Sequence, residues 1–91
     1  MFSIHPNSGF VITFANEWSV SVRFGYGNYC DNKDASTYTT PMDEQLDCPN
    51  AEIAVINPDG DLVEWDDWGD TVKGWMKPNE VMDVMCQVQV L

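Results

Sequence analysis

Residues 64 to 70 read EWDDWGD, which places four carboxylates, two indole rings and one glycine in seven positions. Carboxylates this dense can bind cations or form an anionic surface, and tryptophans surrounded by charge are typical of protein interfaces. The flanking chain extends the pattern, because residues 34 to 72 contain eleven carboxylates and no Lys or Arg. The segment therefore predicts a docking surface for a basic partner.

The residues assigned to this predicted surface are either acidic or indole-bearing, and they all lie between positions 59 and 75. They are Asp59, Asp61, Glu64, Trp65, Asp66, Asp67, Trp68, Asp70 and Trp75. The competing interpretation is structural. In that case the tryptophans cover one end of a small core and the aspartates only solvate a loop.

A calcium site is the first alternative use of these carboxylates, because Asn57, Asp59 and Asp61 alternate along the chain. An EF-hand loop that starts at Asn57 requires glycine at its sixth position and a bidentate glutamate at its twelfth. The chain has Leu62 and Trp68 at those positions. We therefore predict no metal site and no cofactor.

The sequence also offers few residues that could act in catalysis. The chain has a single histidine, His5, and a Cys-His pair with Cys30 would also need a third group to orient it. Paired carboxylates are so abundant that no particular pair is informative. We expect a protein that is not an enzyme.

A second candidate site lies at residues 25 to 30, which read GYGNYC. A Gly-x-Gly pattern binds phosphate when it joins a strand to a helix, and no helix signal follows here. Two tyrosines and an asparagine could still hold a small planar ligand by stacking and amide hydrogen bonds. The ligand-binding residues of this alternative are Gly25, Tyr26, Gly27, Asn28 and Tyr29, and the competing interpretation is a structural bend.

The composition limits the partners. Fifteen Asp and Glu against four Lys and Arg give a formal net charge of −11, which disfavours direct binding to nucleic acid or to an anionic membrane. A basic protein partner fits this charge, although the charge could also serve only for solubility. No apolar stretch is long enough to span a membrane and no signal sequence is recognisable, so we expect a cytoplasmic protein. Three widely spaced cysteines predict reduced thiols.

Two hairpins are predicted. Residues 10 to 14 and 18 to 24 alternate apolar and polar side chains around a turn at 15 to 17, where Asn16 suits a left-handed conformation. Residues 51 to 56 are apolar on both faces, as in a central strand, and the turn at 58 to 60 leads to a return strand at 62 to 65. Between the hairpins, residues 28 to 50 keep no period, and only 42 to 48 suggest a helical turn.

A helix is predicted from Pro78 to the C-terminus. Its apolar stripe consists of Val81, Val84, Met85, Val88 and Leu91, at the spacing of an amphipathic helix. Pro78 fits the first helical position, and Glu80 complements the helix dipole. A last strand at QVQVL is the alternative.

Together these elements predict one α+β domain over residues 1 to 91. It has a mainly antiparallel sheet of about four strands, made of two hairpins, with the C-terminal helix packed on one face. At 91 residues we expect a marginally stable monomer or a homodimer.

The stretches GFVITFANEWSVSVRFGYGNYC, AEIAV, WGDTVKGW and PNEV resemble short accessory proteins of tailed bacteriophages. The resemblance covers most of the chain and implies a context rather than a site, because small phage accessory proteins often inhibit host machinery. Our leading hypothesis is therefore an anti-CRISPR-like inhibitor, or nucleic-acid mimic, that acts on a host defence or nucleic-acid-handling protein in the bacterial cytoplasm. The alternatives are a small-ligand binder, such as a sponge for a nucleotide signal, and a phage structural or assembly component.

Overall fold

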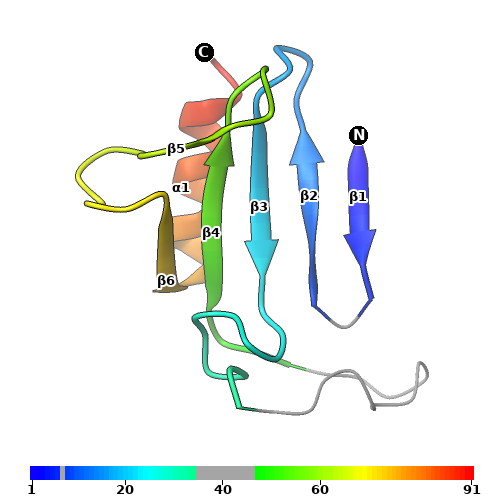
Figure 1. The fold of residues 1–91 in the computed structure, drawn as a ribbon, viewed down its shortest axis with the longest axis vertical. Helices are drawn as coiled ribbons and strands as arrows, with labels where there is room; N and C mark the ends of the chain where they lie inside the picture. Colours follow the sequence, from blue (N-terminus) through cyan, green and yellow to red (C-terminus); the bar gives the residue numbers. More distant parts are fainter. Residues whose placement is uncertain (7, 35–46) are drawn as a thin grey trace.

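The computed structural model describes residues 1–6, 8–34 and 47–91 of the chain. It is an α+β fold with one antiparallel sheet and a C-terminal helix behind it (Figure 1). The strands are β1 (Phe2–His5), β2 (Gly9–Thr13), β3 (Ser19–Arg23), β4 (Ala51–Ile56), β5 (Leu62–Val63) and β6 (Val72–Met76). The helix α1 spans Pro78–Val88. The sheet order is β1-β2-β3-β4-β5, and β6 also pairs with β4.

The first predicted hairpin is β2 and β3, and its register places Phe10 opposite Val22 and Ile12 opposite Val20. The turn lies where the sequence places it, but the prediction for Asn16 is wrong. Glu17 takes the left-handed conformation, with φ 70°. Asn16 contributes its side chain instead, because its Oδ1 accepts a hydrogen bond from Trp18 N at 3.1 Å.

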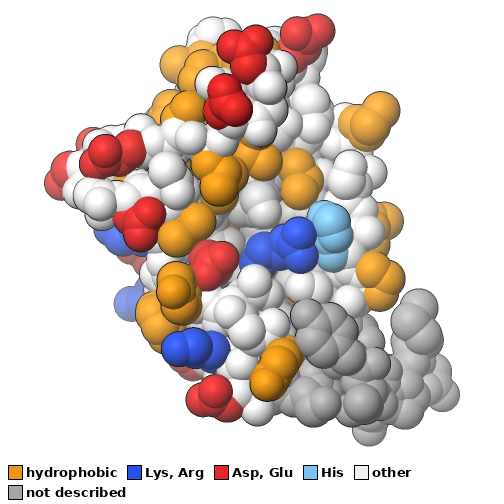
Figure 2. Space-filling view, viewed as in Figure 1, with side chains coloured by type: hydrophobic (Ala, Val, Ile, Leu, Met, Phe, Trp, Pro, Cys, Tyr) orange, Lys and Arg blue, Asp and Glu red, His pale blue; other side chains and the backbone are white. Residues whose placement is uncertain are grey.

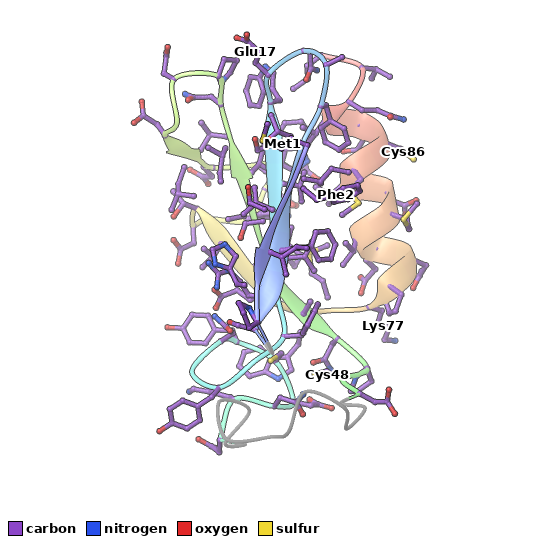
Figure 3. The ribbon with its side chains drawn as sticks, turned by 90° about the vertical axis from the view of Figure 1, so that its right-hand side faces the viewer. Met1, Phe2, Glu17, Cys48, Lys77 and Cys86 are labelled. Atoms are coloured by element: carbon purple, nitrogen blue, oxygen red, sulfur yellow. The ribbon has the colours of Figure 1, made fainter. Side chains whose placement is uncertain are left out.

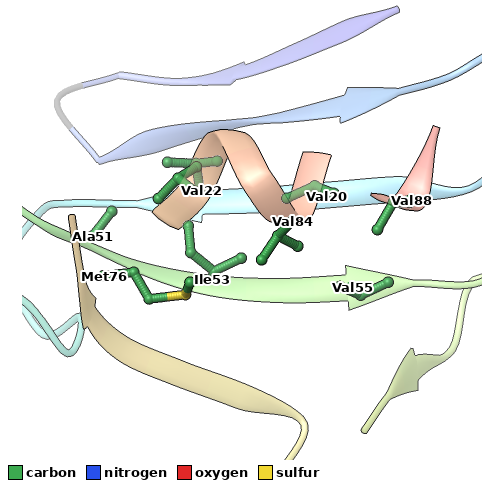
Figure 4. Close-up of a cluster of buried hydrophobic side chains, with 9 residues drawn as sticks. Val20, Val22, Ala51, Ile53, Val55, Met76, Val84 and Val88 are labelled. Atoms are coloured by element: carbon green, nitrogen blue, oxygen red, sulfur yellow. The ribbon is translucent and has the colours of Figure 1, made fainter. Parts of the chain in front are cut away.

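The strand β4 is central, as its apolar residues on both faces predicted, and it pairs with β3, β5 and β6. Its register continues the apolar rows of the first hairpin, since Val22 lies opposite Ile53 and Val20 opposite Val55. These side chains meet α1 on one face of the sheet (Figure 4). The core consists of Val20, Val22, Ala51, Ile53, Val55, Met76, Val81, Val84 and Val88.

The helix begins at Pro78, and Glu80 Oε1 accepts a hydrogen bond from Lys77 N at 2.9 Å, which satisfies one free backbone donor at the helix start. The buried stripe of Val81, Val84 and Val88 confirms the predicted amphipathic face and excludes the alternative of a last strand. Leu91 was wrongly assigned to this stripe. The helix ends before it, and the Leu91 side chain is 56% exposed.

Two strands were not predicted, so the sheet has six strands rather than about four. The strand β1 is short and is followed directly by Pro6, and residues 72 to 76 carry Gly74 and a kinked backbone at Trp75, which hides their strand pattern. The predicted return strand at 62 to 65 is also shorter, since β5 ends at Val63.

The predicted helical turn at 42 to 48 lies largely outside the described residues. Among the residues that are described, no helix is long and apolar enough to cross a membrane.

Candidate functional site

The turn between β4 and β5 directs its carboxylates outward because an asparagine organises its backbone. Asn57 Oδ1 accepts hydrogen bonds from Asp59 N at 3.0 Å and from Asp61 N at 2.9 Å. Gly60 takes a positive φ of 87°, which glycine adopts without steric cost. The side chain that opens the alternating Asn-Asp-Asp pattern is therefore used to fold the turn, and both aspartates are exposed.

The loop from β5 to β6 separates its indoles from its carboxylates. Trp65 packs edge-on against Trp18, with ring centroids 6.5 Å apart, and its Nε1 donates to Gln87 Oε1 on α1 at 3.3 Å. Trp68 also packs against the core, and both rings are half-buried. Asp66, with φ 53°, reverses the chain between them. The tryptophans thus hold the loop against the fold while its acidic side chains face solvent.

All six carboxylates assigned to the predicted surface are exposed. Acidic side chains gather at the end of the molecule near the β4–β5 turn and on the side formed by the β5–β6 loop (Figure 2). We call this region the acidic surface and define it by Asp59, Asp61, Glu64, Asp66, Asp67 and Asp70. Of its carboxylates, Asp70 also has a local role, since its Oδ1 accepts from Thr71 N at 2.6 Å.

Trp75 has a different environment from the other two assigned tryptophans. It lies on β6 with φ 52°, and its ring stacks on Tyr29 with centroids 5.9 Å apart and an interplanar angle of 18°. The backbone joins the same two residues, because Trp75 N donates to Tyr29 O at 2.8 Å. Gly74 permits this approach, since a Cβ there would lie 2.6 Å from Tyr29 Cβ. The structure therefore connects one residue of the first predicted site to the second.

The polar groups of residues 25 to 30 are largely used to fold their own loop. Asn28 Oδ1 accepts hydrogen bonds from Gly25 N at 3.3 Å and from Ser8 Oγ at 3.5 Å. Gly27 N donates to Lys33 O at 2.8 Å, and Tyr29 N donates to Glu52 Oε2 at 2.8 Å. The rings of Tyr26, Tyr29 and Trp75 are each about half exposed.

Cys30 and His5 are the two residues that the sequence offered for nucleophilic and acid–base chemistry. Cys30 is buried, and this burial raises the pKa of its thiol to about 11, with the neighbouring Cys48 adding to the effect. The thiol is therefore protonated at neutral pH. His5 lies on the face of the sheet opposite the helix, in a row with Arg23 and Glu52. Within the described residues, no group of three His, Cys, Asp or Glu could hold a metal ion.

A cavity that the sequence did not predict lies between α1 and the β1–β2 side of the sheet. Its volume is about 340 Å³, and its lining is almost entirely apolar. Phe2, Phe10 and Ile12 line it from the sheet, and Met82 and Met85 line it from the helix. The sequence did contain a signal for the strand that forms one wall of this cavity. Phe2 and Ile4 alternate with polar residues, which repeats the pattern of residues 10 to 14.

Comparison of the chain with protein-family models, with curated proteins and with solved structures finds no match.

Proposed function

We propose that this protein is a non-enzymatic binding protein whose acidic surface docks onto a basic protein. The observation that carries the proposal is the outward orientation of all six carboxylates on two loops that are fixed by Asn57 and by the half-buried Trp65 and Trp68. A surface that is already ordered loses little conformational entropy on binding, and its field accelerates encounter with a cationic partner.

The partner class that best fits this surface is a protein whose Lys and Arg side chains form a groove for nucleic acid. Carboxylates spaced along two consecutive loops can replace phosphates in such a groove, and the exposed parts of the indoles can add apolar contact. Occupation of the groove would block the bound protein's own substrate. In the phage context that the sequence resembles, the target is a host defence or nucleic-acid-handling protein, and the consequence of binding is inhibition.

The experiment compares two triple variants that remove the same charge. Asp59→Asn/Asp66→Asn/Asp67→Asn neutralises the acidic surface, and asparagine tolerates the left-handed conformation of position 66. The control, Asp31→Asn/Asp34→Asn/Asp83→Asn, neutralises three exposed aspartates outside it. Each protein is immobilised, a bacterial lysate is passed over it, and retained proteins are identified by mass spectrometry.

We expect the wild type and the control to retain a nucleic-acid-binding protein and to inhibit its activity, and the acidic-surface variant to bind it roughly ten-fold or more weakly. Binding should also weaken as salt rises from about 0.1 M to about 1 M, because the screening length falls from about 10 Å to about 3 Å. Equal retention by the two triple variants would contradict the proposal, because it would assign binding to net charge or to another surface.

A second candidate function has its own supporting observation. The stacked rings of Tyr29 and Trp75 are 45% and 51% exposed, and Lys33 Nζ lies 5.5 Å from the Tyr29 centroid. A cation beside exposed aromatic rings suits a planar anion such as a nucleotide. Under this alternative one nucleotide of a panel should raise the melting temperature of the wild type, and Trp75→Ala should abolish that shift. A panel without any shift would eliminate it.

A further inference from the structure

The strand β1 leaves one edge of the sheet open. Met1 and Thr13 exchange two backbone hydrogen bonds, with Met1 N to Thr13 O at 2.9 Å and Thr13 N to Met1 O at 2.8 Å. Bonded and non-bonded pairs alternate along an antiparallel ladder, so the N–H and C=O groups of Phe2 and Ile4 point away from β2. Among the described residues, β1 has no strand neighbour besides β2 to receive these four groups.

The side chains of this edge are apolar and accessible. Phe2 lies opposite Ile12 and Ile4 opposite Phe10, so both project toward the side of the sheet that carries α1. They are 66% and 77% exposed, and Phe2 also lines the apolar cavity beside the helix. Figure 3 looks onto this edge, with Phe2 in front and α1 to one side.

Within β1 itself, little opposes pairing. Exposed strands are usually protected by a charged side chain, a proline, a bulge or a very short length. The strand β1 is short and Pro6 follows it, but its residues Phe-Ser-Ile-His include no Asp, Glu, Lys, Arg or Pro and pair with β2 in regular register. Neither β1 nor β2 contains Asp or Glu. The β5–β6 loop, which carries part of the acidic surface, lies at the opposite side of the sheet (Figure 1).

We propose that β1 is a self-association edge, at which a second copy of the chain pairs antiparallel with the first about a two-fold axis at Ser3. In this register Phe2 lies opposite Ile4 of the second copy, and Ile4 lies opposite its Phe2. Both are hydrogen-bonded pairs, so all four outward backbone groups of each copy find partners. The two sheets become one continuous sheet.

The register follows from the residues of β1. Residues directly opposite each other in an antiparallel pair project from the same side of the sheet. A two-fold axis therefore pairs odd-numbered residues with odd-numbered residues and even-numbered with even-numbered. A register centred on Ile4 would place Phe2 opposite Pro6, which has no N–H to donate. The register centred on Ser3 instead repeats the Phe–Ile pairing that β1 already makes with β2.

A second copy suits this edge better than the basic partner of the acidic surface. Among the residues that the structure describes, neither the edge nor the cavity lining has a carboxylate that would recognise a cation, whereas the Phe-x-Ile pattern is complementary to itself. The contact between two four-residue strands is small and falls below about 1,200 Å², the lower end of specific interfaces, so we expect a weak and reversible dimer. Each copy carries a net charge of −11, so added salt should strengthen this dimer by screening repulsion.

Sedimentation equilibrium from about 1 µM to about 1 mM protein tests the dimer. The average mass of the wild type should rise with concentration from that of one 10.3 kDa chain toward that of two chains. Ile4→Lys should raise the dissociation constant of the dimer at least ten-fold. Leu62→Lys is the matched control, because Leu62 is 51% exposed on β5 at the opposite edge and the substitution changes net charge equally. Circular dichroism of both variants checks that each is folded.

Cysteine cross-linking tests the register. In a background with Cys48→Ser and Cys86→Ser, Ser3→Cys should form an intermolecular disulfide under mild oxidation. The two Ser3 Cα atoms would be about 4.5 Å apart, within the range of a disulfide. His5→Cys should not cross-link, because its copies would be about 13 Å apart along the strands.

A wild type that stays monomeric throughout, an Ile4→Lys variant that dimerises like Leu62→Lys, or His5→Cys cross-linking as readily as Ser3→Cys would each overturn this inference. These outcomes leave the acidic-surface proposal intact. Failure of the acidic-surface proposal would likewise leave the dimer proposal intact, because the acidic-surface variant has an unchanged β1. Salt separates the two interactions further, because it should weaken binding to a basic protein and strengthen the dimer.

Discussion

At the scale of single residues, the arrangement of EWDDWGD shows how tryptophan and aspartate can share one short loop. A large ring contributes stability in proportion to the area it removes from water, so Trp65 and Trp68 pack against the core. The aspartates between and beside them keep their hydration by facing outward. The same loop therefore stabilises the fold and presents charge.

Cys30 provides a prediction at this scale, because burial raises the pKa of its thiol from 9.0 to about 11. Between these pH values the unfolded chain releases the proton and the native protein retains it, so stability falls as pH rises through this window. We expect Cys30 to contribute a loss of roughly 2 to 3 kcal/mol in the free energy of unfolding.

Urea unfolding under reducing conditions, at several pH values from about 8 to about 11, measures this effect. Cys30→Ala is the comparison, because it keeps all the other titrating groups and removes the thiol. The difference in unfolding free energy between the two proteins should shrink above pH 9. Parallel curves would show that the thiol does not carry the effect.

At the scale of elements, Asn16 connects the first hairpin to the end of α1. Its Nδ2 donates to Val88 O at 3.0 Å, in the last turn of α1, and to Leu91 O at 3.2 Å, beyond the end of the helix. Its Oδ1 meanwhile holds Trp18 N in the turn. One amide thus stabilises the turn and fixes the helix over β3 and β4.

Asn16→Asp should therefore destabilise the protein, because a carboxylate keeps the bond to Trp18 N and places negative charge against the helix carbonyls. We expect a loss of about 1 to 3 kcal/mol at neutral pH, measured by urea unfolding. The neighbouring Ala15→Ser is the control, since Ala15 is exposed and should tolerate the change. Equal stability of Asn16→Asp and the wild type would show that these bonds contribute little.

At the scale of the whole molecule, the net charge of −11 opposes the folded state, since the compact chain brings its carboxylates together. We expect the melting temperature to rise with sodium chloride at low protein concentration, and most steeply below about 0.1 M. Asp59→Asn/Asp66→Asn/Asp67→Asn should melt higher than the wild type in low salt, with a smaller salt response. A salt response equal to that of the wild type would place the repulsion elsewhere in the chain.

The sequence alone determined the two hairpins, the central position of residues 51 to 56 and the helix from Pro78, because these elements depend on local periodicity and turn chemistry. The strands β1 and β6 were not predicted from the sequence. Pairing through β4 stabilises β6 although Gly74 and Trp75 interrupt its pattern, and β1 is too short to be distinguished from a chain end without its partner β2.

The sequence also identified the acidic and aromatic residues of the candidate sites, since their types and spacing are local properties. Only the tertiary structure decided their neighbours. It stacks Trp75 on Tyr29 and connects Asn16 to the end of α1, contacts that join segments far apart in the chain. It also leaves Phe2 and Ile4 exposed, because the core forms where β3, β4 and α1 meet and does not extend to β1. Residue types establish what a side chain can do, and the packing of distant segments establishes what it meets.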